Sequence, residues 1–276
     1  MNASSPAQEA GGDGRSNALF LRGLGRSSAL ERLWHGDSLP VHWWDQPRVG
    51  SVDALTEAAA LELERMAADA PVHVIGHSFG AQVARALADS RPERISRLTL
   101  LGCPFDPVEG AICLGEAIAR KSRNEALEHC VRRVRESRNL DAFREMIRAA
   151  AADPSFPAIY FGPDSAEVRD WFLDLARQAV SVDFEMFFAL MNDFLRNPPE
   201  LAESRYRGEV RVILGKHDPV LAPEKDIRKW RAAFPGASFV WLDAGHYVHL
   251  ESGPECWLDR RVDSAAHPSN KPIGAR

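Results

Sequence analysis

Short runs of apolar residues alternate with stretches of helical periodicity through the first hundred residues of the chain. The runs Ala18–Leu21, Val41–Trp44, Pro71–Ile75 and Ile95–Leu101 predict four buried strands. Between them, segments such as Ser51–Ala67 place apolar residues three and four positions apart, which predicts helices. Alternating strands and helices are typical of βαβ units, so we expect a mostly parallel sheet with helices on both faces.

The alternation stops near Pro104 and resumes about a hundred residues later. The intervening segment shows helical spacing and no convincing strand, whereas Val210–Leu214 and Phe239–Leu242 are again short apolar runs. We therefore expect a sheet of about six strands that is interrupted by an inserted helical lid. The expected parts are a disordered tail over residues 1–16, a core formed by 17–104 and 206–262, a lid over 105–205, and a second disordered tail over 263–276.

Composition narrows the class of protein. A chain of 276 residues with 45% hydrophobic residues suits one large α/β domain with an insertion. The 34 basic and 39 acidic residues give a net charge of −5, which provides no basic field for nucleic acid. No run of about 18 uncharged apolar residues predicts a membrane span. The polar start lacks a secretory signal and the four cysteines are scattered, which favours the cytoplasm and argues against a disulfide framework or a zinc site.

The most informative pentapeptide is Gly76-His77-Ser78-Phe79-Gly80, which matches the pattern G-x-S-x-G. It follows the third predicted strand and opens a helix that is rich in small residues. A nucleophile on such a sharp turn needs small neighbours, because strand and helix approach closely there, and the two glycines meet that need. The amide of Phe79 then lies at a helix N-terminus, where negative charge is favoured. Ser78 is therefore the candidate nucleophile.

A serine nucleophile needs a base, and the base needs an acid to orient it. Asp218 and His246 each come just after one of the two late strands. Because sites in open parallel sheets form at the carboxyl ends of the strands, we expect these two residues to converge with Ser78. Asp106, which follows the fourth predicted strand, is a competing acid, although its position favours Asp218.

These pieces together resemble the lid-bearing serine hydrolases of the α/β-hydrolase fold, of the esterase and C–C hydrolase type. The matching segments are Gly76–Gly80, Leu214–Pro219, Ala244–His246 and Asp45–Ser51, the last being similar to the family's D-x-P-G-x-G-x-S loop. The order of serine, acid and histidine along the chain is also that of the family. The resemblance spans about residues 18–262 and implies an α/β-hydrolase fold whose chemistry uses no cofactor and no metal.

The resemblance also implies an oxyanion hole. In relatives the residue after a His-Gly pair points its amide at the oxyanion, so the corresponding donors here are the amides of Leu24 and Phe79. Arg22 stands in place of the usual histidine, where it either braces the loop or binds a carboxylate of the substrate. His77 and Trp44 are further candidates for contact with the substrate.

These features predict a serine hydrolase that cleaves a small carboxylic ester, a small-molecule acyl substrate, through an acyl-enzyme. A thioesterase or a C–C bond hydrolase would use the same three residues, and a lyase or a ligand-binding protein on this scaffold is a further alternative. An acyl carrier or coenzyme A is expected as a partner only for a thioesterase, because the mixed charges of residues 116–148 are typical of a solvated helix face. We expect no nucleic acid or membrane partner, and the sequence leaves the oligomeric state open.

Overall fold

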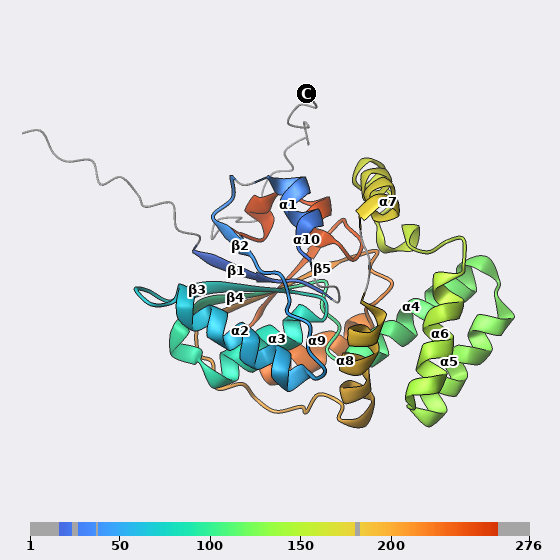
Figure 1. Ribbon diagram of the computed structural model, residues 1–276, viewed down its shortest axis with the longest axis horizontal. Coiled ribbons are helices and arrows are strands. Elements are labelled where there is room, and N and C mark those ends of the chain that lie inside the picture. Colours follow the sequence, from blue (N-terminus) through green and yellow to red (C-terminus); the bar gives the residue numbers. More distant parts are fainter. Residues whose placement is uncertain (1–16, 24–26, 37, 180–182, 259–276) are drawn as a thin grey trace, which may run out of the picture.

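One parallel six-stranded sheet forms the centre of the molecule (Figure 1). The computed structural model describes residues 17–23, 27–36, 38–179 and 183–258. The strands are β1 (Ala18–Leu21), β2 (Val41–Trp43), β3 (Val72–His77), β4 (Ile95–Leu101), β5 (Glu209–Gly215) and β6 (Ser238–Leu242). Their order across the sheet is β2-β1-β3-β4-β5-β6, and every neighbouring pair is parallel. The predicted α/β fold with a parallel sheet is confirmed.

The third strand is longer than the sequence predicts. It extends through Gly76 and His77, because Gly76 pairs with Leu100 and His77 pairs with Leu101 in β4. The chain leaves the sheet only at Ser78. The residue before the candidate nucleophile is therefore part of the sheet and shares its rigidity.

Helices cover both faces of this sheet (Figure 1). On one face lie α2 (Val52–Met66), α3 (Gly80–Ser90) and α9 (Pro223–Ala233), and on the other lie α1 (Ala29–His35) and α10 (Val248–Glu251). Of two 3₁₀ turns in the core, η1 (Pro92–Arg94) joins α3 to β4, and η3 (Pro254–Cys256) follows α10. Successive strand residues point to opposite faces, so Leu19 and Leu21 enter the largest apolar cluster while Ala18 and Phe20 enter a second, smaller one. Burial of both faces explains why the strands are continuous apolar runs.

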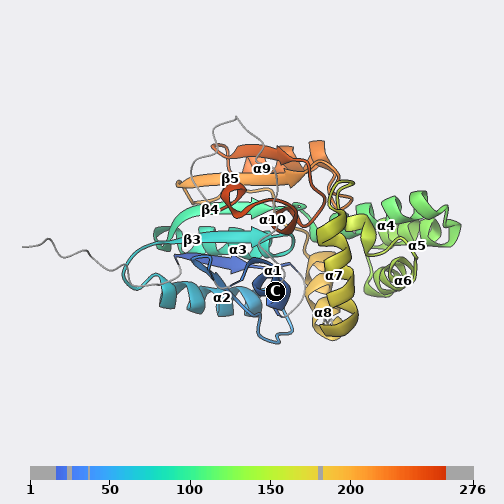
Figure 2. The ribbon, with the colours of Figure 1, turned by 90° about the horizontal axis from the view of Figure 1, so that it is seen from above.

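A helical segment separates β4 from β5. It contains α4 (Pro107–Ser122), α5 (Glu125–Ser137), α6 (Leu140–Ala151), the 3₁₀ turn η2 (Ala158–Tyr160), α7 (Ala166–Ala179) and α8 (Phe184–Arg196). Viewed from above, α7 and α8 stand between the sheet and the group α4–α6 (Figure 2). The described part of this segment holds no strand, as the sequence predicts. Its action as a lid stays a prediction, as do the limits 105–205.

Polar caps divide the inserted segment into separate helices. Asp106, Asn124, Asn139 and Asp183 each accept a hydrogen bond from an amide in the first turn of the helix that follows. Such side chains satisfy donors that have no partner within the helix. The sequence therefore sets where α4, α5, α6 and α8 begin.

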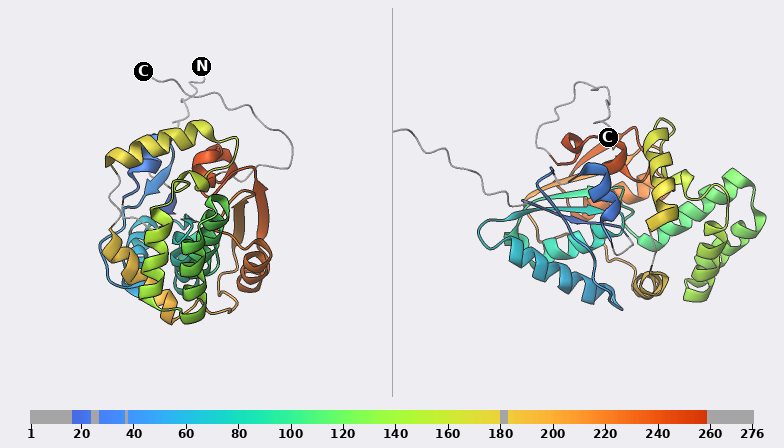
Figure 3. Two further views of the ribbon diagram at one scale, coloured as in Figure 1. Left: turned by 90° about the vertical axis from the view of Figure 1, so that its right-hand side faces the viewer. Right: turned by 45° about the horizontal axis from the view of Figure 1, so that its top comes forward.

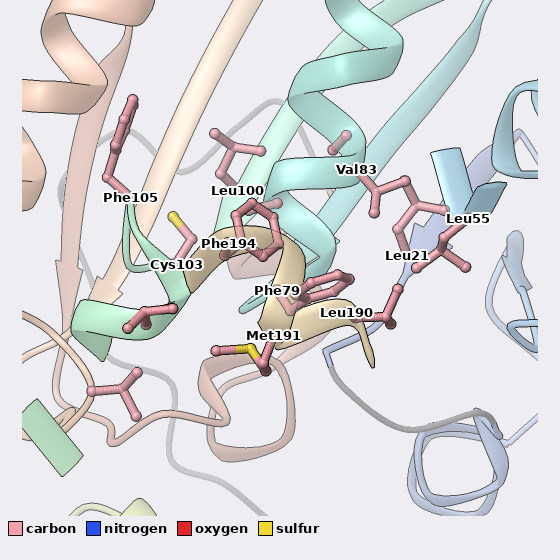
Figure 4. Packing of buried hydrophobic residues seen from close by; sticks show 14 of the residues in the cluster. Leu21, Leu55, Phe79, Val83, Leu100, Cys103, Phe105, Leu190, Met191 and Phe194 are labelled. Atoms are coloured by element: carbon pink, nitrogen blue, oxygen red, sulfur yellow. The ribbon is translucent and has the colours of Figure 1, made fainter. Parts of the chain in front are cut away.

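Two of these helices anchor the insertion to the core. On one side α7 lies beside α1 (Figure 3), where the Trp34 and Trp171 rings have centroids 4.7 Å apart. On the other side α8 packs over the start of α3 (Figure 4), and the ring of Phe194 meets that of Phe79 edge-on at 5.6 Å. Leu190 of α8 is fully buried in the same cluster. The insertion is thus continuous with the hydrophobic core.

The two predicted tails lie outside the described residues, and so do residues 259–262 of the predicted core. Within the described ranges, no helix combines the length and apolar character that crossing a bilayer requires.

Candidate active site

Ser78 occupies a strained turn between β3 and α3. Its φ angle is +54°, in the left-handed region that costs a residue with a side chain about 1–3 kcal/mol. The turn is also tightly enclosed: a Cβ atom on Gly80 would lie 2.1 Å from the carbonyl oxygen of Leu21, and one on Gly76 would lie 2.7 Å from the carbonyl oxygen of Gly80. Both contacts are with backbone, so only glycine fits at either position.

The structure brings the three predicted residues into one hydrogen-bonded row. The hydroxyl of Ser78 lies 3.0 Å from Nε2 of His246, and Nδ1 of His246 lies 2.9 Å from Oδ2 of Asp218. The other carboxylate oxygen of Asp218 accepts from the amide of Val220 at 2.8 Å. The Asp218 side chain is fully buried and that of His246 is 6% exposed. This is the geometry by which a carboxylate orients a histidine that faces a serine.

The competing acid lies elsewhere. Asp106 caps α4 by accepting from the amides of Val108 and Glu109, and its second oxygen lies 3.3 Å from a guanidinium nitrogen of Arg138. The ambiguity between Asp106 and Asp218 is therefore resolved by geometry: Asp218 is the carboxylate in contact with His246.

Neighbouring backbone and side chains hold the histidine loop from two sides. The amide of His246 donates to the carbonyl of Tyr160 in η2 at 2.6 Å. Nε2 of His77 lies 3.0 Å from the carbonyl oxygen of His246. His77 therefore supports the backbone of the histidine loop and also lines the cavity. Burial and the nearby His249 hold the pKa of His77 well below its usual value, so His77 is neutral at pH 7.

The proposed oxyanion hole is described only in part. Phe79 stands at the N-terminus of α3, and its amide comes before the amides of Ala81 and Gln82, which donate to the carbonyl oxygens of Ser78 and Phe79. A Cβ atom on Gly23 would lie 3.2 Å from Cβ of Ser78, so the loop after β1 runs directly beside the nucleophile. Leu24 lies outside the described residues, and its amide stays a prediction.

Sequence reasoning missed Gln46, which supports this loop. Its buried side chain donates through Nε2 to the carbonyl oxygens of Arg22 at 3.1 Å and of Gly23 at 3.3 Å. The only signal in the sequence is a polar residue inside the loop Asp45–Ser51. The hydrogen-bonded partners are 24 and 23 residues away from Gln46 in the sequence, so no local pattern predicts these contacts.

Arg22 lines the cavity, and its positive charge is paired with a buried carboxylate. Its guanidinium Nη2 is 3.5 Å from Oε1 of Glu31, a fully buried residue of α1. Burial by itself would raise the pKa of Glu31, but Arg22 and His249 outweigh burial and lower it to about 2. Glu31 is therefore ionised and neutralises Arg22. Sequence reasoning did not single out Glu31.

A cavity of about 390 Å³ opens above Ser78. The core contributes His246, Phe79 and Leu30 to its lining, while the insertion contributes more of the apolar side chains that line it. Among those of the insertion are Leu114, Ile147, Phe156, Phe187 and Met191. Apart from histidines, Arg22 is the one ionisable side chain among the described residues that line the cavity with a charge at pH 7. A site with this lining suits an apolar, uncharged ligand.

Trp44 does not contact this cavity. It is buried in the largest apolar cluster and is absent from the described residues that line the site. Among the described residues, the prediction that Trp44 contacts a substrate beside Ser78 therefore finds no support, because its side chain is packed in the hydrophobic core.

A family model described as the alpha/beta hydrolase family matches residues 16–256, which is most of the chain. The chain belongs to the alpha/beta hydrolase family. The match spans the parallel sheet, the turn at Ser78 and the helices inserted between β4 and β5.

Among curated proteins, the lipase LipV of Mycobacterium tuberculosis is 40% identical over 74 residues, which is 27% of this chain and 26% of the lipase. The match thus spans about a quarter of that relative. The solved structure of an enol-lactonase from Burkholderia xenovorans is 22% identical, covers 85% of both chains and has a TM-score of 0.55. The 2-hydroxy-6-oxo-6-phenylhexa-2,4-dienoate hydrolase of a Rhodococcus species is 18% identical over 87% of both chains, with a TM-score of 0.54. These likenesses show the fold.

No group of three His, Cys, Asp or Glu side chains within the described ranges is arranged to hold a metal ion. The expectation that the chemistry needs no metal stays a prediction.

Proposed function

We propose that this member of the alpha/beta hydrolase family is a serine hydrolase that cleaves a small carboxylic ester with an apolar acyl group. The observation that carries the proposal is the hydrogen-bonded row of Ser78, His246 and Asp218 beneath an apolar cavity. A row of this kind activates a serine for acyl transfer. The chain is similar to a lipase and to an enol-lactonase, two names that denote hydrolysis of ester bonds, and this supports the choice of reaction.

The reaction begins when Oγ of Ser78 attacks the ester carbonyl carbon while Nε2 of His246 takes the hydroxyl proton. Asp218 holds the proton on Nδ1 and stabilises the imidazolium that forms. The amides of Phe79 and Leu24 donate to the oxyanion, each contributing about 3 kcal/mol to the lowering of the barrier. Collapse of the tetrahedral intermediate breaks the bond to the alcohol oxygen, which receives the proton from His246.

Water completes the cycle. His246 removes a proton from a water molecule, which attacks the acyl carbon, and Ser78 leaves with that proton restored to its oxygen. In this scheme the inserted helices act as a lid that excludes other water from the cavity and contacts the acyl group. The scheme uses no metal and no cofactor.

The electrostatics of the cavity favour a neutral substrate. A dienoate of the kind named for the Rhodococcus hydrolase carries a carboxylate, which needs an unopposed cation when it is buried. Arg22 is already neutralised by Glu31 at 3.5 Å. The cavity therefore suits an uncharged ester better than a C–C substrate of that class.

A panel of substrates tests the proposal. We expect hydrolysis of p-nitrophenyl acetate, butyrate and octanoate, with kcat/KM rising from acetate to butyrate because each buried methylene contributes about 0.8 kcal/mol. Ser78→Ala should abolish turnover. Ser90→Ala, which removes an exposed hydroxyl at the far end of the same helix, should retain it.

Other outcomes would replace the proposal. Turnover of acyl-coenzyme A alone would make the protein a thioesterase, and turnover of a dienoate alone would make it a C–C hydrolase. Release of cyanide from a hydroxynitrile would indicate a lyase. Tight binding of an ester without turnover would indicate a ligand-binding protein.

A further inference from the structure

One carboxylate joins the histidine loop to the inserted helices. Oε2 of Glu251, in α10, accepts a hydrogen bond from the amide of Gly245 at 2.9 Å and another from the amide of Gly162 at 2.7 Å. Gly245 directly precedes His246, and Gly162 lies two residues after Tyr160 at the end of η2. A single oxygen atom thus holds two segments that are 83 residues apart in sequence, from 162 to 245.

The two segments are in direct backbone contact at this point. The amide of His246 donates to the carbonyl of Tyr160 at 2.6 Å. A Cβ atom on Gly245 would lie 2.1 Å from the same carbonyl oxygen and 2.8 Å from the amide nitrogen of Gly162. Because these neighbours are backbone atoms, the two segments are in van der Waals contact and leave no room for a side chain at position 245. Movement of the η2 segment would move the backbone of His246.

The η2 segment also forms part of the active site. The ring of Tyr160 lies 5.3 Å from the imidazole of His246, measured between centroids, and Tyr160 lines the cavity. The backbone that Glu251 fixes is thus the backbone that covers the proposed base.

We propose that Glu251 is a positioning residue, which fixes the histidine loop against the insertion and so keeps His246 in line with Ser78. The inference rests on the proposed function, since it concerns the proton transfer by His246. It also divides the insertion: the part around residues 160–162 is a fixed wall of the site, and any opening of the cavity must come from other parts of the insertion. Hydrogen bonds to a carboxylate are about twice as strong as those between neutral groups, which suits a joint of this kind.

The geometry predicts how substitutions rank. Oε1 of Glu251 has no hydrogen-bond partner among the described residues, so the amide oxygen of a glutamine could accept both bonds in place of Oε2. Aspartate is one methylene shorter and cannot keep both bonds. Alanine leaves both amides without this acceptor.

The experiment compares Glu251→Ala, Glu251→Asp and Glu251→Gln with wild type on p-nitrophenyl butyrate. We expect Glu251→Ala to lower kcat about 100-fold with KM changed less than about threefold, because misplacement of a catalytic group by about 1 Å costs that much. Glu251→Asp should behave similarly, and Glu251→Gln should recover kcat to within about fivefold of wild type. The control is Glu255→Ala, which removes an exposed carboxylate four residues further on and should match wild type.

A second variant approaches the joint from the insertion. A Cβ atom on Gly162 would lie 3.2 Å from Oε2 of Glu251 and 3.3 Å from two backbone atoms of Ala244, so Gly162→Ala should push both the carboxylate and the histidine loop away from the η2 segment and lower kcat. If the two residues act through one joint, the double variant should lose little more than the worse single variant.

Thermal unfolding separates positioning from a purely structural role. The inference is overturned if Glu251→Ala lowers Tm but keeps kcat, or if Glu251→Gln is as slow as Glu251→Ala while both are folded. It is also overturned if the effects of the two single variants on kcat multiply in the double variant. Failure of the proposed function gives a different result, since wild type itself would then turn over no ester.

Discussion

Replacing Asp218 by asparagine should disable the site while leaving the fold intact. The two oxygens of the carboxylate have different partners, since Oδ1 accepts from the amide of Val220 at 2.8 Å and Oδ2 accepts from Nδ1 of His246 at 2.9 Å. An asparagine can reproduce only one of these contacts. Its amide oxygen must face Val220, because the opposite orientation would set two buried donors against each other at a cost of about 1–3 kcal/mol.

The NH₂ group of the asparagine then faces Nδ1 of His246, which must become an acceptor. The proton moves to Nε2, the atom that has to take the proton of Ser78. A histidine held in this tautomer cannot act as the base, and the expected loss in kcat is about 10⁴-fold. That loss corresponds to about 5 kcal/mol of barrier. Stability should change little, since the buried side chain keeps its shape and loses a charge.

The assay is the steady-state kcat on p-nitrophenyl butyrate, with Tm recorded for each variant. Asp106→Asn is the matched control, because Asp106 caps α4 and has no contact with His246 among the described residues. It should keep kcat and lose at most about 1 kcal/mol of stability, through the ion pair with Arg138, because asparagine caps a helix about as well as aspartate. Retention of more than a tenth of wild-type kcat by folded Asp218→Asn would rule out this role for Asp218, and so would an inactive Asp106→Asn.

Three further predictions concern stability and metal dependence. The pKa of Glu31 is lowered to about 2, from 4.5, so its contribution of about 3 kcal/mol is fully present above pH 4.5 and is lost as the pH falls toward 2. The difference in unfolding free energy between wild type and Glu31→Gln should therefore shrink over that range in denaturant titrations, and a constant difference would contradict the Arg22–Glu31 pair. Leu190→Ala should lower the unfolding free energy by about 3 kcal/mol, because Leu190 is fully buried where α8 meets the core, and a loss below about 1 kcal/mol in urea would argue against that packing. Treatment with EDTA should leave ester hydrolysis unchanged, whereas inactivation that added metal reverses would show that the scheme is incomplete.

Local sequence pattern was sufficient for the sheet. The expected strand Ile95–Leu101 has the limits of β4, because every residue except Ser96 is buried and the run is bounded by a 3₁₀ turn and Gly102. The apolar run predicts that β3 ends at Ile75, whereas the strand extends to His77. Gly76 is a poor strand residue, and it stays in the strand because Leu21 of β1 and Leu100 of β4 pair with it from the two sides.

The three residues of the row could be proposed because each follows a strand, and parallel strands end at the same edge. The choice between Asp218 and Asp106 could not be made in this way, since both follow strands. The choice depends on the contacts that each carboxylate makes in the folded chain. Asp106 caps α4, whereas Asp218 faces His246.

The residues that support the site could not be predicted either, because their roles also depend on contacts that form only in the folded chain. Gln46, Glu31 and Glu251 act on backbone or charge that lies far away in sequence, and none has a local signature. A buried polar residue is recognised by its partner, and the partner is known only once the chain has folded.

Labelling with a fluorophosphonate probe shows whether Ser78 is a nucleophile, because the probe modifies only a serine that is activated. Intact mass and peptide mapping should show one adduct, on Ser78, in wild type and in Ser90→Ala. Ser78→Ala, folded by the same Tm criterion, should show none. Absence of an adduct on folded wild type, or an adduct that persists in Ser78→Ala, would contradict the account of Ser78 as an activated nucleophile.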